Sequence, residues 1–403
     1  MGFPGPKRDE GSSRPNRRRV TTPQGAALNR LQPLAIEQNS KRVMRSGTMS
    51  FFNARRVLVA ATAAVALVSV VQAATDISGA GATFPTPIYS KWADTYKKQT
   101  GVGLNYQSIG SGGGIKQIKA RTVTFGASDM PLKPDDVKES GLVQFPMIIG
   151  GAVPAVNVKG VGAGQMVLDG ATIASIYMGE ITKWSDARIK KLNPKLALPD
   201  TAIAPIYRSD GSGTNFLFSD YLSKSSPKFK ESIGANSSVQ WPTGIGAKGN
   251  EGLANMVTQT DGAIGYVEYA YAKQNKMAYT QLVNKDGKAV APSADSFAAA
   301  AANADWAHAP AYYLILTDQA GAKSWPITGA SFILVYAQPQ DLAATTEALK
   351  FFNWAYKSGA QMAAELDYVP LPESLIKQVR ATWKSEIKGI PALSEAAPAA
   401  KRM

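Results

Sequence analysis

Asp210-Gly211-Ser212-Gly213-Thr214 is the densest of three short stretches in which small residues and a hydroxyl side chain directly precede a helical pattern. The other two are Ala80-Gly81-Ala82-Thr83-Phe84 and Gly110-Ser111-Gly112-Gly113-Gly114. In such a stretch, backbone N–H groups, a side-chain O–H and the positive end of a helix dipole converge on one point, which suits an oxyanion. One such stretch is a weak signal, because Gly and Ser also form ordinary turns. Three in one chain predict an anion-binding cage.

The sequence around these stretches alternates apolar runs with helical patterns, which predicts an α/β architecture. We expect strands at residues 122–128, 203–207, 262–266 and 331–336, and a longer β-rich segment at 143–158 that is broken by Gly150-Gly151 and Pro154. We expect helices after Pro85, over 215–222 and over 345–356, and a frayed tail from Ile390. The three stretches fall between strands and helices, where open α/β sheets bind their ligands.

Two segments are candidates for links between domains: residues 145–158 and the stretch around Trp325-Pro326. If both connect the same two lobes, the chain crosses twice and forms a cleft with a hinge. We therefore expect one lobe from residues 74–152 plus 325–403 and the other from residues 153–324.

The first 73 residues differ in composition from the rest. Residues 1–48 are rich in Pro, Arg and Ser without a hydrophobic period, so we expect them to be disordered. Residues 49–73 are typical of a cleavable signal peptide, with Arg55-Arg56 before an apolar run that is shorter than the roughly 20 residues of a membrane span. A twin-arginine signal is the alternative, but the wider pattern favours the general secretory route. Since a signal peptide belongs at an N-terminus, we interpret residues 1–48 as an over-long gene prediction and expect export to the periplasm.

The chain has no Cys and a single His, His308. Disulfides, thiolate nucleophiles, cysteine metal sites and a lipid anchor on Cys are therefore excluded. We expect a protein that is soluble outside the cytoplasm, with no metal and no cofactor. His308 is interpreted as an ordinary surface or packing residue without an acidic partner nearby.

The net charge of +14 is concentrated at the start of the chain, because residues 1–73 contribute +9 of it. The remaining +5 suits an anionic ligand but not a nucleic-acid surface, which needs a dense basic stripe. Arg17-Arg18-Arg19 on its own is compatible with an RNA-binding arm, but it lies in the extension that we expect to be absent from the mature protein.

The stretch at 210–214 lacks the Gly-Lys-[Ser/Thr] ending of a nucleotide-binding loop. It also lacks the Gly-x-Ser-x-Gly pattern of a hydrolase, since Asp210 occupies the first position. Ser212 and Thr214 are candidate donors to an anion. Arg208 offers a planar fork suited to phosphate or carboxylate, and Asp210 is placed to orient it. The alternative is a capped turn with a surface arginine.

Asp129 follows the predicted strand that ends at Ser128. A carboxylate beside a bound anion is unfavourable unless the anion carries a proton that it can donate. Asp129 would then accept from hydrogen phosphate and reject sulfate, because a site built around a ligand O–H discriminates against analogues that lack it. The alternative is a cap for the turn before Pro131.

Two further hydroxyls have competing interpretations. Thr83 either donates to a ligand or caps the helix that begins near Pro85. Ser111 precedes three glycines whose folding cost indicates close approach of a ligand, although Ser is also a favoured N-cap. Gly244-Ile245-Gly246 and Gly249-Asn250 are better explained as ordinary turns.

Together these motifs resemble one family, the phosphate-binding proteins of bacterial phosphate-specific ABC transporters, over residues 75–388. The resemblance rests on Gly79-Ala80-Gly81-Ala82-Thr83-Phe84-Pro85, Phe125-Gly126-Ala127-Ser128-Asp129, Asp210-Gly211-Ser212-Gly213-Thr214 and Gly262-Ala263-Ile264-Gly265-Tyr266-Val267-Glu268-Tyr269. It implies a two-lobed periplasmic-binding-protein fold with the ligand buried between the lobes. It implies phosphate contacts from Thr83, Phe84 through its backbone, Ser111, Asp129, Arg208, Ser212, Gly213 and Thr214, with Asp210 as the acidic partner of the arginine. One departure is local: Ser111 is followed by Gly112-Gly113-Gly114, where relatives often have a second Ser.

The expected function is capture of inorganic phosphate and its delivery to an ABC permease with a cytoplasmic ATPase, by a monomer that performs no catalysis. One alternative is a receptor for another oxyanion such as sulfate. Another is a phosphatase or phosphotransferase with Ser212 or Asp129 as the nucleophile, which needs a general base or a metal cluster.

Overall fold

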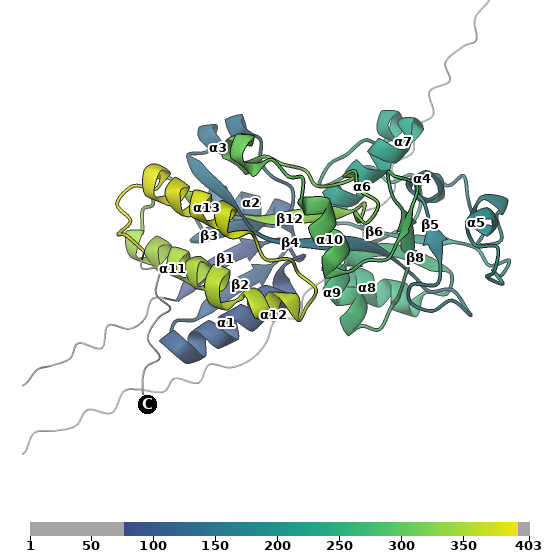
Figure 1. Cartoon of the computed structure of the whole chain (residues 1–403), viewed down its shortest axis with the longest axis horizontal. Coiled ribbons are helices and arrows are strands. Elements are labelled where there is room, and N and C mark those ends of the chain that lie inside the picture. Colours follow the sequence, from purple (N-terminus) through teal and green to yellow (C-terminus); the bar gives the residue numbers. More distant parts are fainter. Residues whose placement is uncertain (1–75, 394–403) are drawn as a thin grey trace, which may run out of the picture. The chain divides into compact units, whose positions relative to one another are not determined.

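A computed structural model describes residues 76–393, so the expected extension (1–48) and signal peptide (49–73) lie outside the described residues. Its central feature is a nine-stranded sheet in the order β2-β1-β3-β12-β4-β8-β6-β7, with β9 paired to β4 (Figure 1). The strands are β1 (Ile77–Gly81), β2 (Leu104–Ser108), β3 (Phe125–Ser128), β4 (Leu142–Val156), β6 (Ala204–Arg208), β7 (Ile245–Ala247), β8 (Ala263–Glu268), β9 (Ala278–Tyr279) and β12 (Thr328–Tyr336). A smaller sheet contains β5 (Val167–Leu168), β10 (Gln281–Val283) and β11 (Ala289–Val290).

The sheet has a parallel group at each end. β1 pairs parallel with β2 and β3, and β6 pairs parallel with β7 and β8. The two groups are joined through β12 and β4, which run antiparallel to their neighbours. Parallel strands need crossover helices, so both groups have the α/β organisation predicted from the sequence.

Helices surround both groups of strands (Figure 1). Up to residue 232 they are α1 (Thr86–Thr100), α2 (Ser111–Lys119), α3 (Pro134–Glu139), α4 (Gly170–Tyr177), α5 (Ala187–Leu192), α6 (Gly213–Ser225) and α7 (Pro227–Ser232). The remainder are α8 (Gly249–Gln259), α9 (Tyr269–Gln274), α10 (Ala294–Ala301), α11 (Leu342–Ser358), α12 (Ala360–Ala364) and α13 (Glu373–Glu386). Ile88, Trp92 and Tyr96 of α1 are buried, as their four-residue spacing predicts.

Strand β4 is the element that both halves of the sheet share. Residues 142–151 pair with β12, and residues 152–156 pair with β8. The prediction that Gly150-Gly151 and Pro154 break this segment is wrong, because β4 is one continuous strand. The two glycines make room for aromatic rings: a Cβ on Gly150 would lie 2.9 Å from Phe84 Cζ, and one on Gly151 would lie 2.2 Å from Phe297 Cε1. Pro154 lacks an N–H, but its carbonyl accepts from Thr280 N at 3.0 Å.

The three Gly-rich stretches occupy the strand-to-helix junctions that the sequence predicts. Residues 82–85 join β1 to α1, residues 109–110 join β2 to α2, and residues 209–212 join β6 to α6. Asp129 directly follows β3, the strand next to β1. The carboxyl ends of β1, β2 and β3 meet at one edge of the parallel group, so the loops that follow these strands lie next to one another.

Two smaller expectations are wrong. Ile390 and Leu393 are partly buried against the hydrophobic core, so fraying does not begin at Ile390; residues 394–403 lie outside the described residues. His308 has an acidic partner, Asp305, whose carboxylate lies 2.9 Å from His308 Nδ1. The side chain of His308 is exposed, in agreement with an ordinary surface role.

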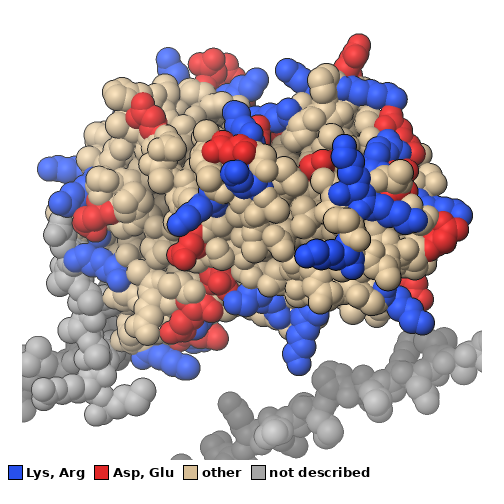
Figure 2. Space-filling view, turned by 45° about the vertical axis from the view of Figure 1, so that its right-hand side comes forward, with Lys and Arg blue, Asp and Glu red and all other residues tan. Residues whose placement is uncertain are grey.

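The surface of the described part mixes both signs of charge. Figure 2 shows Lys and Arg interspersed with Asp and Glu on the visible face, without a basic stripe of the kind that binds nucleic acid. Within residues 76–393, no helix combines the length and the apolar character that a membrane crossing requires.

The packing around Gly151 in β4 and around Gly252 in α8 predicts opposite effects of a Gly→Ala substitution on the free energy of unfolding. Gly151→Ala places a methyl group against Phe297 and is expected to lower the free energy of unfolding by about 1–3 kcal/mol. Gly252→Ala in α8, where a Cβ meets nothing within 4 Å, is expected to raise it by about 0.5–1 kcal/mol. Urea denaturation measures both, and equal values for the two variants would contradict the tight packing of the strand.

Candidate functional site

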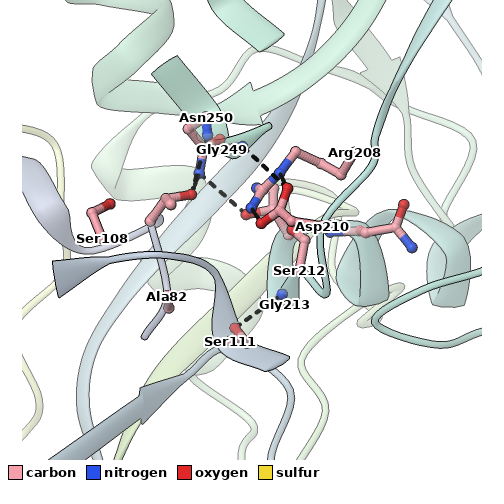
Figure 3. Close-up of polar contacts among 12 residues, drawn as sticks. Ala82, Ser108, Ser111, Arg208, Asp210, Ser212, Gly213, Gly249 and Asn250 are labelled. Atoms are coloured by element: carbon pink, nitrogen blue, oxygen red, sulfur yellow. Dashed lines mark hydrogen bonds and ion pairs between the residues drawn. The ribbon is translucent and has the colours of Figure 1, made fainter. Parts of the chain in front are cut away.

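The three Gly-rich loops converge on one place (Figure 3). The second and third loops are joined by two hydrogen bonds: Gly112 N donates to Gly211 O at 2.9 Å, and Gly213 N donates to Ser111 Oγ at 3.0 Å. The first loop is joined to the third through Asn250, whose Nδ2 lies 2.6 Å from Thr83 Oγ1 and 3.4 Å from Thr214 Oγ1. The convergence predicted from the sequence is therefore present.

Gly213 permits the closest approach between these loops. A Cβ at this position would lie 2.5 Å from Asp129 Cβ and 2.6 Å from Ser111 Oγ. Any larger residue would separate α6 from the loops that follow β2 and β3. The glycine is required by packing across the site.

Arg208 and Asp210 form a buried bidentate pair. Arg208 Nε lies 2.7 Å from Asp210 Oδ1, and Nη2 lies 2.5 Å from Oδ2. Burial opposes ionisation of Asp210, but the hydrogen bonds and charge of Arg208 outweigh it and hold the pKa of Asp210 below its usual range. Asp210 Oδ1 also accepts from Gly249 N at 3.1 Å, which fixes the pair against α8. The guanidinium is thus oriented by Asp210, and the alternative of a surface arginine is wrong.

Asp129 is 1% exposed, and its two carboxylate oxygens have different surroundings. Oδ1 accepts from Ser331 Oγ at 2.8 Å, whereas Oδ2 is buried and has no hydrogen-bond partner among the described residues. Burial raises the pKa of Asp129 to about 7, outweighing the hydrogen bond from Ser331, the charge of Arg208 and the contact with Ser111, which lower it. Its carboxylate caps no turn before Pro131 in this arrangement.

Arg208, like Asp129, has one side-chain atom without a hydrogen-bond partner among the described residues. Its Nη1 is buried, and no other described residue accepts a hydrogen bond from it. An unpaired buried polar group costs about 1–3 kcal/mol, and more if it is charged. One donor and one acceptor are therefore left unsatisfied at a single site, which is the expected condition of a site that a ligand completes.

The hydroxyls of Ser111 and Thr83 are set up as donors. Ser111 Oγ accepts from Gly213 N at 3.0 Å and from Asp129 N at 3.2 Å. Thr83 Oγ1 accepts from Asn250 N at 3.1 Å and from Asn250 Nδ2 at 2.6 Å. Because both lone pairs of each oxygen are used, each hydroxyl proton is left for a third partner. Thr83 does not cap α1, whose N-cap is Pro85, and Ser111 is the first residue of α2 rather than its cap.

The other predicted contact residues, Ser212, Thr214 and Phe84, lie in the same loops or in the helices that follow them. Ser212 is the N-cap of α6, where its Oγ accepts from Asn215 N at 3.0 Å, so the capping interpretation holds for this residue. Thr214 is fully buried in the first turn of α6. Phe84 buries its ring against Tyr368, and its backbone carbonyl accepts from Tyr368 Oη at 2.7 Å. All eight predicted contact residues are therefore in the three loops, at the end of β6 (Arg208) or at Asp129.

Three residues of this region were missed or undervalued by sequence reasoning. Asn250 lies in the first turn of α8 and bridges Thr83 to Thr214, so the interpretation of Gly249-Asn250 as an ordinary turn was wrong. Ser331 holds Asp129 from the first half of β12, and nothing in its sequence context indicates that. Glu268 is fully buried at the end of β8, and burial raises its pKa well above the usual range. Its position in the quoted 262–269 motif was the available signal.

The described residues contain no group of three or more His, Cys, Asp or Glu side chains that could hold a metal ion. The polar groups of the site are instead one arginine, one acidic acceptor and several neutral donors at the starts of α2 and α6. Neutral donors at helix N-termini are suited to a small oxyanion.

Two parallel groups of strands joined by antiparallel strands, with Gly-rich loops that converge at the strand ends, are typical of a substrate-binding protein of the PBP type. The PBP superfamily domain matches residues 68–358. The phosphate-binding protein PstS of Pasteurella multocida is 54% identical over 312 residues, covering 77% of this chain and 91% of that protein. The PstS of Xylella fastidiosa (strain 9a5c) is 53% identical, with 77% and 86% covered. The chain belongs to this PstS family within the PBP superfamily.

Solved structures agree on the fold. A phosphate-binding protein from Stenotrophomonas maltophilia has a TM-score of 0.60 at 21% identity, covering 80% of this chain and 99% of that one. A substrate-binding protein with bound phosphate from Clostridium perfringens, described as that of a phosphate ABC transporter, has a TM-score of 0.54 at 19% identity, covering 74% and 100%. The α/β periplasmic-binding-protein fold expected from the sequence is confirmed.

The environment of Asp129 predicts how the stability of the arrangement with the loops in contact depends on pH. The folded-state pKa of about 7 lies above the ordinary value of 3.8, so the folded protein holds this proton more tightly than the unfolded chain. The contribution of Asp129 to the free energy of unfolding therefore falls as pH rises from about 4 to about 7 and then levels off. Asp129→Asn cannot ionise and is expected to be about 1–3 kcal/mol more stable than the wild type at pH 8. Urea denaturation between pH 5 and pH 8 measures this, and parallel profiles for the two proteins would contradict it.

Proposed function

We propose that this protein captures inorganic phosphate outside the cytoplasm and delivers it to an ABC permease for import. The observation that carries the proposal is the pair of unsatisfied buried atoms, Asp129 Oδ2 and Arg208 Nη1, beside the hydroxyls of Thr83 and Ser111. A phosphate oxygen accepts from Arg208, and a protonated phosphate oxygen donates to Asp129. Thr83, Ser111, Ser212 and Thr214, with the N–H groups of Phe84 and Gly213, supply the remaining donors.

Selectivity for phosphate over sulfate follows from the acceptor atom, Asp129 Oδ2. Hydrogen phosphate satisfies Asp129 Oδ2, whereas sulfate brings an oxygen without a proton against it, at a cost of roughly 1.5–3 kcal/mol. Arg208 is neutralised by Asp210, so the anion is held mainly by directional hydrogen bonds rather than by excess positive charge. The site therefore distinguishes anions by protonation and shape.

We propose two lobes, made of residues 74–152 plus 325–403 and of residues 153–324. In this arrangement the loops that bear Thr83, Ser111 and Asp129 belong to the first lobe, and those that bear Arg208 and residues 212–214 belong to the second. Strands β4 and β12 and the segment at Trp325-Pro326 would form the hinge. Phosphate would favour the closed state because it is bound by both lobes, and the permease would recognise that state.

The remaining proposals concern the setting of this protein in the cell. Residues 49–73 would direct it to the periplasm, where it would act as a monomer with a permease driven by a cytoplasmic ATPase. It would leave phosphate chemically unchanged, because Ser212 Oγ is used as a helix cap and Asp129 Oδ1 is held by Ser331 rather than by a general base.

Calorimetric titration at pH 8 with phosphate and, separately, sulfate tests the proposal. We expect tight phosphate binding and negligible sulfate binding by the wild type. Asp129→Asn replaces the acceptor with a donor, so we expect phosphate binding about 10- to 150-fold weaker and measurable sulfate binding. Equal affinity of the wild type for both anions would favour a general oxyanion receptor, and turnover of a phosphate ester would favour a phosphotransferase.

Gly213 provides a test of closure. Gly213→Ala places a methyl group 2.5 Å from Asp129 Cβ and 2.6 Å from Ser111 Oγ, which are contacts between the proposed lobes. We expect phosphate binding about 5- to 150-fold weaker and a ligand-free protein that still folds. Small-angle scattering should show that phosphate lowers the radius of gyration of the wild type and of Gly252→Ala, but not of Gly213→Ala. Closure of the Gly213→Ala variant to the wild-type value would argue against this arrangement of lobes.

A further inference from the structure

Three consecutive carbonyl groups of the first loop accept hydrogen bonds from three tyrosine hydroxyls. Tyr106 Oη donates to Ala82 O, Tyr271 Oη to Thr83 O and Tyr368 Oη to Phe84 O, each at 2.7 Å. The tyrosines come from β2, α9 and the segment after α12, so distant parts of the chain hold one short loop. The loop is buried, so water cannot satisfy its carbonyls, and phenols from three distant elements do so instead.

Each carbonyl fixes the direction of the N–H in its own peptide unit. In a planar trans peptide the C=O of one residue and the N–H of the next point in opposite directions. Holding Ala82 O against Tyr106 therefore turns the N–H of Thr83 away from that phenol, and holding Thr83 O against Tyr271 does the same for the N–H of Phe84. Neither N–H has a hydrogen-bond partner within residues 76–393. Phe84 O precedes Pro85, which has no N–H to orient.

The two phenols remain donors. Burial is the largest influence on Tyr106 and Tyr271 and raises the pKa of both well above the usual range. Among residues 76–393, Tyr106 has a single acceptor, Ala82 O. Tyr271 has one proton and two acceptors, because Glu251 Oε1 lies 2.9 Å away, in addition to Thr83 O.

We infer that Tyr106 and Tyr271 are positioning residues that aim the N–H groups of Thr83 and Phe84 at the bound anion. This inference rests on the proposed function. Tyr106 lies in the same proposed lobe as the loop and orients Thr83 N–H before closure. Tyr271 lies in the other proposed lobe, so it orients Phe84 N–H only when the lobes meet and couples closure to the strength of anion binding.

The test is Tyr271→Phe, which keeps the ring and removes the hydroxyl. We expect phosphate to dissociate about 2- to 12-fold faster, with an association rate close to that of the wild type, because the hydrogen bond forms after encounter. The unfolding midpoint of the ligand-free protein should not change, since the contact is absent while the lobes are apart. Tyr106→Phe should weaken phosphate binding by a similar factor and also lower that midpoint. Stopped-flow kinetics and thermal unfolding provide these values.

Two controls separate positioning from packing. Tyr269→Phe removes a hydroxyl on the same helix that contacts Tyr279 instead of the loop, so phosphate kinetics should match the wild type. Glu251→Ala removes the competing acceptor and commits the Tyr271 proton to Thr83 O, so dissociation should be unchanged or slower. A loss of packing would instead make both Tyr271→Phe and Glu251→Ala dissociate faster.

The outcomes distinguish this inference from the proposed function. If the wild type binds phosphate tightly and Tyr271→Phe has the same dissociation rate as Tyr269→Phe, the inference is wrong and the proposed function stands. If Glu251→Ala dissociates as fast as Tyr271→Phe, the carboxylate is the functional partner of Tyr271 and the inference is also wrong. If the wild type does not bind phosphate, both fall together.

Discussion

The burial of Asp129 and Arg208 with one unpartnered atom each is the constraint on which the rest of the site depends. Both groups have their other polar atoms satisfied, Asp129 by Ser331 and Arg208 by Asp210. The folded protein therefore bears the free-energy cost of two unsatisfied buried atoms at this site, while the neighbouring polar atoms of both side chains are hydrogen-bonded. A ligand that is an acceptor at one edge and a donor at another removes this cost, which explains why the site is buried and yet incomplete.

The same constraint accounts for the glycines and the neutral donors. The loops after β1, β2 and β6 must approach within van der Waals contact to enclose so small a ligand, and Gly213 allows the approach of α6 to Asp129. Once they are this close, Ser111 and Thr83 use their lone pairs on N–H groups from across the site. The contacts that join the loops are thus the contacts that occupy the lone pairs of these hydroxyls and leave each proton for another partner.

Much of this could be predicted from the sequence, because the signals are local. A Gly-rich stretch between an apolar run and a helical pattern fixes a strand-to-helix junction, and Arg208 and Asp210 are two residues apart and therefore neighbours. Asn250 and Ser331 could not be predicted, since they reach the site through sheet order and helix placement, which single-sequence periodicity does not encode. Gly150 and Gly151 were misread for the same reason: their ring partners, Phe84 and Phe297, are distant in sequence. The Tyr106, Tyr271 and Tyr368 contacts likewise arise only from tertiary structure.

An atomic-resolution crystal structure of the protein with phosphate is the most direct test of the account. We expect one phosphate, with one oxygen within hydrogen-bond distance of Arg208 Nη1 and another within hydrogen-bond distance of Asp129 Oδ2. The contacts of Asp129 with Ser331 and of Arg208 with Asp210 should persist in that structure. Phosphate bound elsewhere, or bound here with Asp129 turned away from it, would contradict the claim that these two atoms are left unsatisfied for the ligand.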